Sequence, residues 1–364
     1  MKINFIDLQA QYLAYQAEID SEVLEVFSSA QFIGGEKLNR LENSLATYTG
    51  AKHAIGCSSG TDALLLALMA LDVGAGDEVI TTPFTFIATA EVIAFLGAKP
   101  VFVDIENETY NIDPKKIEDA ITERTKAIIP VSLYGQCADM DAINEIAKRH
   151  SLPVIEDACQ SFGATYNSKK SCNLSTIGCT SFFPSKPLGC YGDGGAIFTS
   201  DDALAEKMRI LLNHGQDARY KHKYIGINGR LDAVQAAVLN VKLKHFDKEV
   251  SIRDEIGARY SDLLEDADVI TPKIADTNTS VYAQYSIRVK DREAMVAKLN
   301  EKEIPTAVHY PIPLHIQEAF KYLGYERGDF PVSEEVSTQI MSLPMSPYLT
   351  EAQQDYIVEA IKGN

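Results

Sequence analysis

The chain has 364 residues, of which 46% are hydrophobic and 23% charged, and its formal net charge is −17. A chain of this length can bury a large core and is long for one domain, so we expect two. The negative charge argues against nucleic-acid binding, which needs a basic face. No apolar run is long enough to span a bilayer and the first residues do not resemble a signal peptide, so we expect a cytoplasmic protein with no membrane contact.

Between residues 52 and 200, short β-branched runs alternate with helical patterns. A strand pattern at 54–57 precedes a helical pattern at 61–71, and a strand at 78–82 precedes a helix at 85–96. Further strands are expected at 100–105, 127–133, 153–157, 179–183 and 195–200. This alternation predicts an α/β fold with a mixed, mostly parallel sheet flanked by helices.

After residue 201 the pattern changes to long helices and a denser distribution of charge. Helices are expected at 201–213, 231–266 and 291–302, with a strand at 283–289. We therefore predict a large domain over residues 1–250 and a smaller C-terminal α+β domain over residues 251–364.

The six cysteines form no C-x-x-C pair, and no histidine lies at metal-ligand spacing from them. We expect reduced thiols and no metal site.

The segment VIEDACQSFGA (154–164) places Asp157 at the end of an apolar strand. Open α/β sheets bind their ligands at the carboxyl ends of their strands. An acid at this place can equally cap the next helix, so the pattern alone leaves both roles open.

The segment SFFPSKPLGCYGDGGAIF (181–198) holds Lys186 between a strand and a glycine-rich turn. A lone lysine is usually a solvated surface charge. Here Phe182, Phe183 and Leu188 favour burial, and a buried lysine readily becomes a nucleophilic amine.

The segment CSSGTD (57–62) opens a helix, whose first amides and hydroxyls can bind a phosphate. An ordinary serine cap explains this segment equally simply. The chain has no G-x-G-x-x-G and no G-x-x-x-x-G-K-[ST] motif, which disfavours a nicotinamide-dependent oxidoreductase or a P-loop enzyme. Together, a phosphate site, an acid for a pyridinium nitrogen and a lysine for a Schiff base are what pyridoxal 5′-phosphate (PLP) requires.

Many further stretches extend this pattern along the chain, including FIDLQAQY, GDEVITTPFTFIATAE, PVSLYGQCADMDAI, GINGRLDAVQAA, TAVHYPIPLH and MSLPMSPYL. With these stretches the sequence resembles the DegT/DnrJ/EryC1/StrS family of PLP-dependent sugar aminotransferases. It is most similar to the bacterial group of UDP-2-acetamido-2-deoxy-ribo-hexuluronate aminotransferases. Pro187 and Cys190 depart from the commonest family pattern, but neither change removes a functional group.

The resemblance implies a type I aminotransferase-like fold and assigns roles around the cofactor. Lys186 would form the Schiff base and Asp157 would pair with the pyridinium nitrogen. Gln160 would bond the phenolic oxygen, and Phe86 would stack on the ring, although Phe86 could also be a core residue. The residues expected at the phosphate are Gly60, Thr61 and Ser181.

The resemblance also implies a homodimer with shared active sites, because Asn228 would reach the phosphate of the neighbouring subunit. The candidates for binding the acidic parts of a nucleotide sugar are Arg230, His309 and Tyr310. A structural histidine in an irregular turn is a competing explanation for His309.

The implied reaction moves an amino group from L-glutamate to the C3 ketone of a UDP-linked 2-acetamido-2-deoxy-hexuluronic acid. The cofactor would alternate between PLP and pyridoxamine 5′-phosphate, and the 3-amino sugar would serve a surface polysaccharide such as the O-antigen of lipopolysaccharide. One alternative keeps this chemistry on another dTDP- or UDP-linked 3-keto or 4-keto hexose. A more remote alternative is a PLP-binding regulatory module without turnover.

Overall fold

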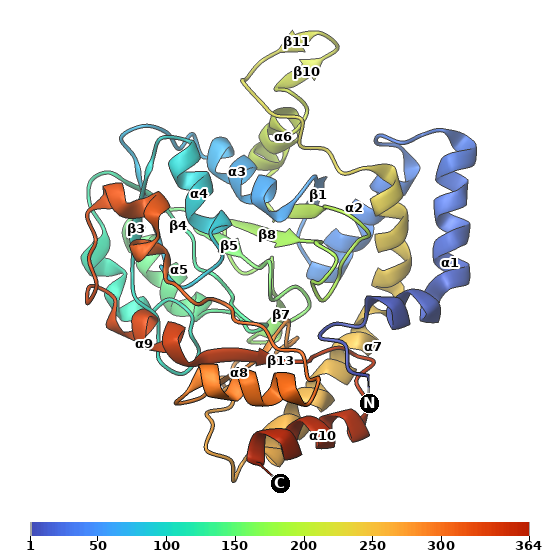
Figure 1. Ribbon diagram of the computed structural model, residues 1–364. Helices are drawn as coiled ribbons and strands as arrows, with labels where there is room; N and C mark the ends of the chain where they lie inside the picture. Colours follow the sequence, from blue (N-terminus) through green and yellow to red (C-terminus); the bar gives the residue numbers. More distant parts are fainter. Residues whose placement is uncertain (1, 364) are drawn as a thin grey trace.

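The computed structural model describes residues 2–363 (Figure 1). Its α-helices are α1 (Leu8–Ser29), α2 (Glu36–Thr49), α3 (Gly60–Ala70), α4 (Ala88–Phe95), α5 (Met140–Arg149), α6 (Asp202–Leu211), α7 (Ala233–Leu263), α8 (Arg292–Glu301), α9 (Pro331–Gln339) and α10 (Glu351–Lys362). Its strands are β1 (His53–Cys57), β2 (Glu78–Thr81), β3 (Lys99–Phe102), β4 (Thr125–Ile128), β5 (Ile155–Asp157), β6 (Thr165–Tyr166), β7 (Lys169–Lys170), β8 (Ile177–Ser181), β9 (Gly195–Thr199), β10 (Gln216–Ala218), β11 (Lys221–His222), β12 (Tyr285–Arg288) and β13 (Ile340–Leu343).

The central sheet has the order β3-β2-β4-β5-β8-β9-β1. Hydrogen bonding joins β3-β2-β4 and β5-β8-β9-β1, and the parallel bridges Ile128–Val154 and Val131–Asp157 connect the two groups. β9 runs antiparallel to both β8 and β1, whereas the other pairings in the sheet are parallel. The predicted mixed, mostly parallel sheet is therefore confirmed.

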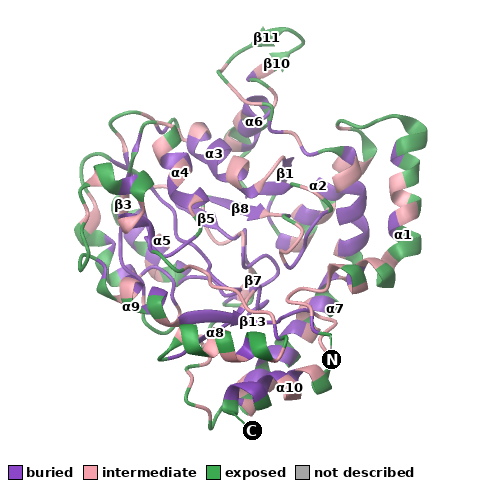
Figure 2. Cartoon of the chain, viewed as in Figure 1, coloured by how far each residue is buried: buried purple, intermediate pink, exposed green. Residues whose placement is uncertain are grey.

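The helices on this sheet bury the apolar stretches that the sequence supplies. α3 is almost entirely buried, and Figure 2 shows it in the interior between the sheet and its neighbouring helices. A helix that is apolar on every side requires cover on every side, and α3 packs against β8, β9, α4 and α6. α5, in contrast, buries only Met140, Ile143, Ile146 and Ala147. The N-terminus of α3 is thereby fixed beside the carboxyl ends of β5 and β8.

The C-terminal elements form a second layer below the sheet in Figure 1. The antiparallel pair β12–β13 shares a core with α8, α10 and the end of α7, centred on Tyr260 and Tyr285. α7 runs unbroken through residue 250, so it belongs to both layers. The division at 250/251 remains a prediction.

Two elements project from this body. α1 packs along α7 through Ile19, Val238 and Val241, and leaves Leu24 and Phe27 exposed. The β10–β11 hairpin extends away from α6 and is exposed along most of its length (Figures 1 and 2). No helix within residues 2–363 is long and apolar enough to cross a membrane.

Candidate active site

A cavity of about 470 Å³ opens at the carboxyl ends of β5 and β8. It brings together nine of the predicted site residues, namely Gly60, Thr61, Phe86, Asp157, Gln160, Ser181, Lys186, His309 and Tyr310. These residues come from segments far apart in the sequence, so the fold itself assembles the site.

Asp157 ends β5 and is 4% exposed. Its Oδ2 accepts a hydrogen bond of 2.8 Å from Thr89 Oγ1 of α4, and its Oδ1 accepts one of 3.2 Å from the backbone amide of Cys159. A buried carboxylate held by two donors keeps a fixed orientation toward the cavity. Of the two roles that the sequence left open for Asp157, helix capping does not occur, because β5 is followed by β6 with no helix between them.

Gln160 is held from two sides. Its Oε1 accepts a hydrogen bond of 3.0 Å from the amide of Tyr134, and its Nε2 donates one of 3.1 Å to Tyr310 Oη. Tyr134 in turn donates its hydroxyl hydrogen bond to the carbonyl of His309. The side-chain amide is therefore orientated by the 133–135 turn and by the C-terminal segment together.

Lys186 lies in the segment after β8, where its amide donates a 2.8 Å hydrogen bond to the carbonyl of Phe183. Its side chain lines the cavity. Burial lowers the pKa of the Lys186 ammonium, and nearby Cys159 and Asp157 partly oppose this effect. A lowered pKa increases the fraction of neutral, nucleophilic amine at neutral pH.

The N-terminus of α3 closes another side of the cavity. Ser59 caps the helix by accepting a 3.0 Å hydrogen bond from the amide of Asp62. Among the described residues, the amides of Gly60 and Thr61 before it have no such partner, so these two can bind an anion. A Cβ on Gly60 would lie 2.6 Å from Ser181 Cβ and 3.0 Å from Cys159 Sγ. Glycine is therefore required for α3 to approach β8 this closely.

Phe86 and His309 occupy the rim. α4 begins only at Ala88, so Phe86 lies in the preceding loop and is 53% exposed, whereas the sequence pattern predicted a helix from residue 85. Its ring centroid is 6.2 Å from that of Tyr310. His309 Nδ1 is 3.0 Å from Ser342 Oγ, and burial together with Lys186 lowers the histidine pKa, which favours the neutral ring.

Asn228 and Arg230 lie outside this cavity. Asn228 is exposed, and Arg230 Nη1 donates a 2.6 Å hydrogen bond to Asn213 Oδ1 in a separate cavity of about 220 Å³. Within one chain, neither residue joins the cluster around Lys186.

The structure adds residues to the cavity that sequence reasoning missed. They include Thr85, Thr89, Cys159, Ser185, Asp193 and Gln284. The position of Thr89 in an apolar helix carried no signal, whereas Asp193 lies within the glycine-rich stretch after Lys186 and could have been suspected.

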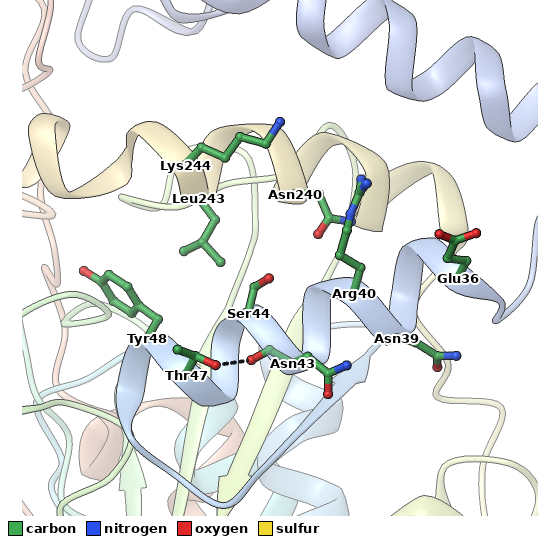
Figure 3. A pocket seen from close by; sticks show the side chains of 10 residues that line it. All are labelled: Glu36, Asn39, Arg40, Asn43, Ser44, Thr47, Tyr48, Asn240, Leu243 and Lys244. Carbon is green, nitrogen blue, oxygen red and sulfur yellow. Dashed lines mark hydrogen bonds between the residues drawn. The ribbon is translucent and has the colours of Figure 1, made fainter.

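A larger groove of about 680 Å³ lies elsewhere, between α2 and α7 (Figure 3). Its basic side chains already have acidic partners, since Arg40 Nη2 is 2.5 Å from Glu22 Oε2 and Lys244 Nζ is 3.5 Å from Glu18 Oε2. Its chemistry gives no reason to place a reaction there, so the cavity around Lys186 is the candidate active site.

The residues of that cavity fit PLP. The free amides at the start of α3 and the close approach of Gly60 to Ser181 suit its phosphate, buried Asp157 suits its ring nitrogen, and Lys186 suits its aldehyde. The order of the sheet and this donor set together define a PLP-dependent transferase.

The sequence profile described as "DegT/DnrJ/EryC1/StrS aminotransferase family" matches residues 14–362, and the chain belongs to this family of PLP-dependent sugar aminotransferases. It is 55% identical to the UDP-2-acetamido-2-deoxy-3-oxo-D-glucuronate aminotransferase of Pseudomonas aeruginosa, over 99% of each chain. It is 51% identical to the "pleiotropic regulatory protein" of Geobacillus stearothermophilus, over 99% of this chain and 98% of the relative.

Solved structures agree with this assignment. A family aminotransferase from Brucella abortus superposes with a TM-score of 0.96 at 42% identity, covering 99% of both chains. DesV of S. venezuelae, described in complex with a ketimine intermediate, superposes with a TM-score of 0.98 at 38% identity, covering 100% of this chain and 98% of the other. The predicted fold class, enzyme class and cofactor are confirmed.

Proposed function

We propose that this enzyme transfers an amino group from L-glutamate to the C3 ketone of a UDP-linked 2-acetamido-2-deoxy-hexuluronic acid. The product would be a 3-amino sugar nucleotide for a surface polysaccharide such as an O-antigen, made in the cytoplasm. The observation that carries the substrate is the 55% identity, along nearly the whole chain, to the P. aeruginosa aminotransferase. The six cysteines are free thiols, as is usual in a reducing compartment.

When bound, PLP supplies an aromatic ring that accepts electrons from the carbon losing its proton. The carboxylate of Asp157, fixed by Thr89, would keep the ring nitrogen protonated. Gln160, fixed by Tyr134 and Tyr310, would donate to the phenolic oxygen. The amides at Gly60 and Thr61, with Ser181, would hold the phosphate, and Phe86 would cover one face of the ring.

Lys186 would have two tasks. Its Nζ would hold the cofactor aldehyde covalently before substrate arrives and, once released, would carry a proton between substrate carbon and cofactor. The lowered pKa of Lys186 favours the neutral amine that both tasks require. His309 and Tyr310, which line the same cavity, would contact the sugar nucleotide.

The first test is an absorbance spectrum of the PLP-loaded protein before and after L-glutamate is added. We expect a band near the visible edge that moves to shorter wavelength as the amine form accumulates. Lys186→Ala should abolish this conversion and lower turnover on the order of 10³-fold, whereas Lys244→Ala, which changes a solvent-exposed lysine, should leave both unchanged. Full turnover by Lys186→Ala would refute the mechanism.

A homodimer with shared active sites is part of the proposal. Asn228 and Arg230 lie outside their own chain's cavity, and Phe27, Phe183 and Ile225 expose large apolar side chains. If Arg230 serves the partner's site, mixing inactive Lys186→Ala chains with inactive Arg230→Ala chains should restore activity, because mixed dimers contain one intact site. A mixture as inactive as its components would show that each site uses residues of one chain.

Two alternatives concern the substrate and the role. A dTDP-linked substrate has support in the 43% identity to the dTDP-3-amino-3,6-dideoxy-alpha-D-galactopyranose transaminase of Aneurinibacillus thermoaerophilus. Comparing kcat/KM for keto-sugars with and without a C6 carboxylate separates these substrates. A regulatory role has support in the name of the G. stearothermophilus relative, but a purely regulatory protein would not convert PLP with glutamate.

A further inference from the structure

The segment that carries Lys186 is held by two side chains of α7 that do not line the cavity. We call residues 184–194 the lysine turn. Lys242 Nζ donates a 2.7 Å hydrogen bond to the carbonyl of Gly189. Gln235 bonds the backbone of Tyr191 twice, because its Oε1 accepts from the amide at 2.8 Å and its Nε2 donates to the carbonyl at 3.2 Å. α7 therefore holds the lysine turn through hydrogen bonds to the backbone of Gly189 and Tyr191.

Lys242 is an unusual residue for this position, since it is only 2% exposed. Its ammonium lies 4.2 Å from the ring centroid of Tyr191 in addition to its bond with Gly189. Burial lowers the pKa of Lys242 to about 8, against the opposing influence of Glu249 and Cys190. Burying a charge is costly, and methionine would fill the space without that cost. Packing alone therefore does not explain a lysine at this position, whereas the hydrogen bond to Gly189 does.

Other bonds to the lysine turn come from the strand before it and from its own thiol. The amide of Phe182 donates to the carbonyl of Gly194 at 2.7 Å, and Cys190 Sγ donates to the carbonyls of Phe182 and Gly192 at 3.0 and 3.2 Å. Among its backbone bonds, the amide of Cys190 donates to the carbonyl of Phe182 at 2.8 Å, and the amide of Lys186 donates to that of Phe183. Gly189 sits so close to the carbonyl of Pro184 that a Cβ would be 2.5 Å from it. A shift of Gly189 would therefore move the start of the turn and, with it, the backbone of Lys186.

We propose that Lys242 and Gln235 are positioning residues for Lys186, which they orientate through the backbone of the lysine turn. Neither residue is among those that line the active-site cavity within residues 2–363, so neither is assigned contact with substrate. The inference rests on the proposed role of Lys186.

The chain provides a matched control on the same helix. Asn240, which is labelled in Figure 3, is 5% exposed. Its Nδ2 donates a 2.9 Å hydrogen bond to the carbonyl of Lys37 at the start of α2. Lys242→Met and Asn240→Leu thus each remove one bond from a buried α7 side chain to a backbone carbonyl. Only the first bond holds the lysine turn.

The test is hydrogen–deuterium exchange on the full-length, PLP-loaded protein, followed by mass spectrometry. In Lys242→Met we expect the amides of residues 184–194 to exchange about tenfold faster, as loss of one charged hydrogen bond implies. The pH titration of the cofactor absorbance band should shift with it. Asn240→Leu should change neither. Equal exchange in the lysine turn of both variants, or an unshifted titration in Lys242→Met, would overturn the inference.

Gln235→Leu provides a second route if Lys242→Met does not fold, because Gln235 is only partly buried. It should release the amide of Tyr191 and shift the same titration, and a protected Tyr191 amide would contradict the proposal.

Borohydride reduction of the wild-type protein distinguishes failure of this proposal from failure of the proposed role of Lys186. A cofactor adduct on another residue would refute the role of Lys186 itself, whereas an adduct on Lys186 leaves only the positioning role in question.

Discussion

At the scale of single residues, the site depends on side chains that fix the groups expected to meet the cofactor. Asp157 is hydrogen-bonded by Thr89, and Gln160 is hydrogen-bonded to Tyr134 and Tyr310. Each of these bonds joins segments that are remote in sequence. Such partners restrict orientation, which is what makes a catalytic group effective. Their removal should reduce activity without removing any reacting group.

Thr89→Val tests this argument. Valine keeps the shape of threonine but cannot donate to Asp157 Oδ2, so the carboxylate loses one of its two donors. Loss of a hydrogen bond to a charged group costs about 1.5–3 kcal/mol, so we expect the glutamate half-reaction to slow roughly 10- to 100-fold. Stopped-flow absorbance measures this rate.

Thr85→Val is the control for that change. Thr85 is buried and its Oγ1 lies 3.2 Å from Thr89 Oγ1, but it makes no bond to Asp157. Its effect should be several-fold smaller. If both variants slow the half-reaction equally, the loss comes from disturbed packing of this region rather than from the bond to Asp157.

At the scale of elements, the sequence pattern predicted where the strands end. It did not predict which side chains of other elements contact those ends. Asp157 and Lys186 were predictable as neighbours of the site because an apolar strand ends at one and a strand precedes the other. The bond from Thr89 to Asp157 was not predictable, because it depends on how α4 docks over β5. The late start of α4 has the same origin: Phe84 is fully buried against Val131 and Leu133, which holds the 83–86 loop out of the helix.

The approach of α3 to β8 gives an element-scale prediction. Gly60→Ala would place a methyl group 2.6 Å from Ser181 Cβ, so α3 or β8 must move. We expect stability to fall by about 1–3 kcal/mol, as for other overpacked sites. The Kd for PLP, measured by fluorescence titration, should rise about tenfold, because the first amides of α3 move with the helix.

Gly74→Ala is the matched control, since a Cβ on Gly74 would have no neighbour within 4 Å. It should leave the Kd for PLP unchanged and alter stability by no more than about 0.5 kcal/mol. A Gly60→Ala protein with wild-type affinity would show that the amides at the start of α3 do not hold the phosphate.

At the scale of the whole molecule, a carboxyl group whose pKa changes on folding makes the free energy of unfolding depend on pH. Glu156, beside Asp157 on β5, is fully buried, and burial raises its pKa to about 8 although the amide of Cys172 donates to its Oε2 at 2.9 Å. Its Oε1 has no hydrogen-bond partner among the described residues. The folded protein therefore keeps a proton on Glu156 under conditions in which the unfolded chain has lost it.

This difference predicts the direction of a pH effect. Between pH 4.5, the ordinary pKa, and pH 8, the folded state binds more protons than the unfolded state, so the contribution of Glu156 to stability falls as pH rises. The slope approaches about 1.4 kcal/mol per pH unit. Glu156→Gln removes this titration, so the free energy of unfolding of this variant should fall less steeply than that of wild type across the same range. Denaturant titrations at several pH values would measure this difference.

Glu145→Gln, at an exposed site on α5, is the control and should follow the wild-type curve. If the Glu156→Gln curve also runs parallel to wild type, Glu156 is ionised in the folded protein, and its charge must then be stabilised by the polar groups around β5.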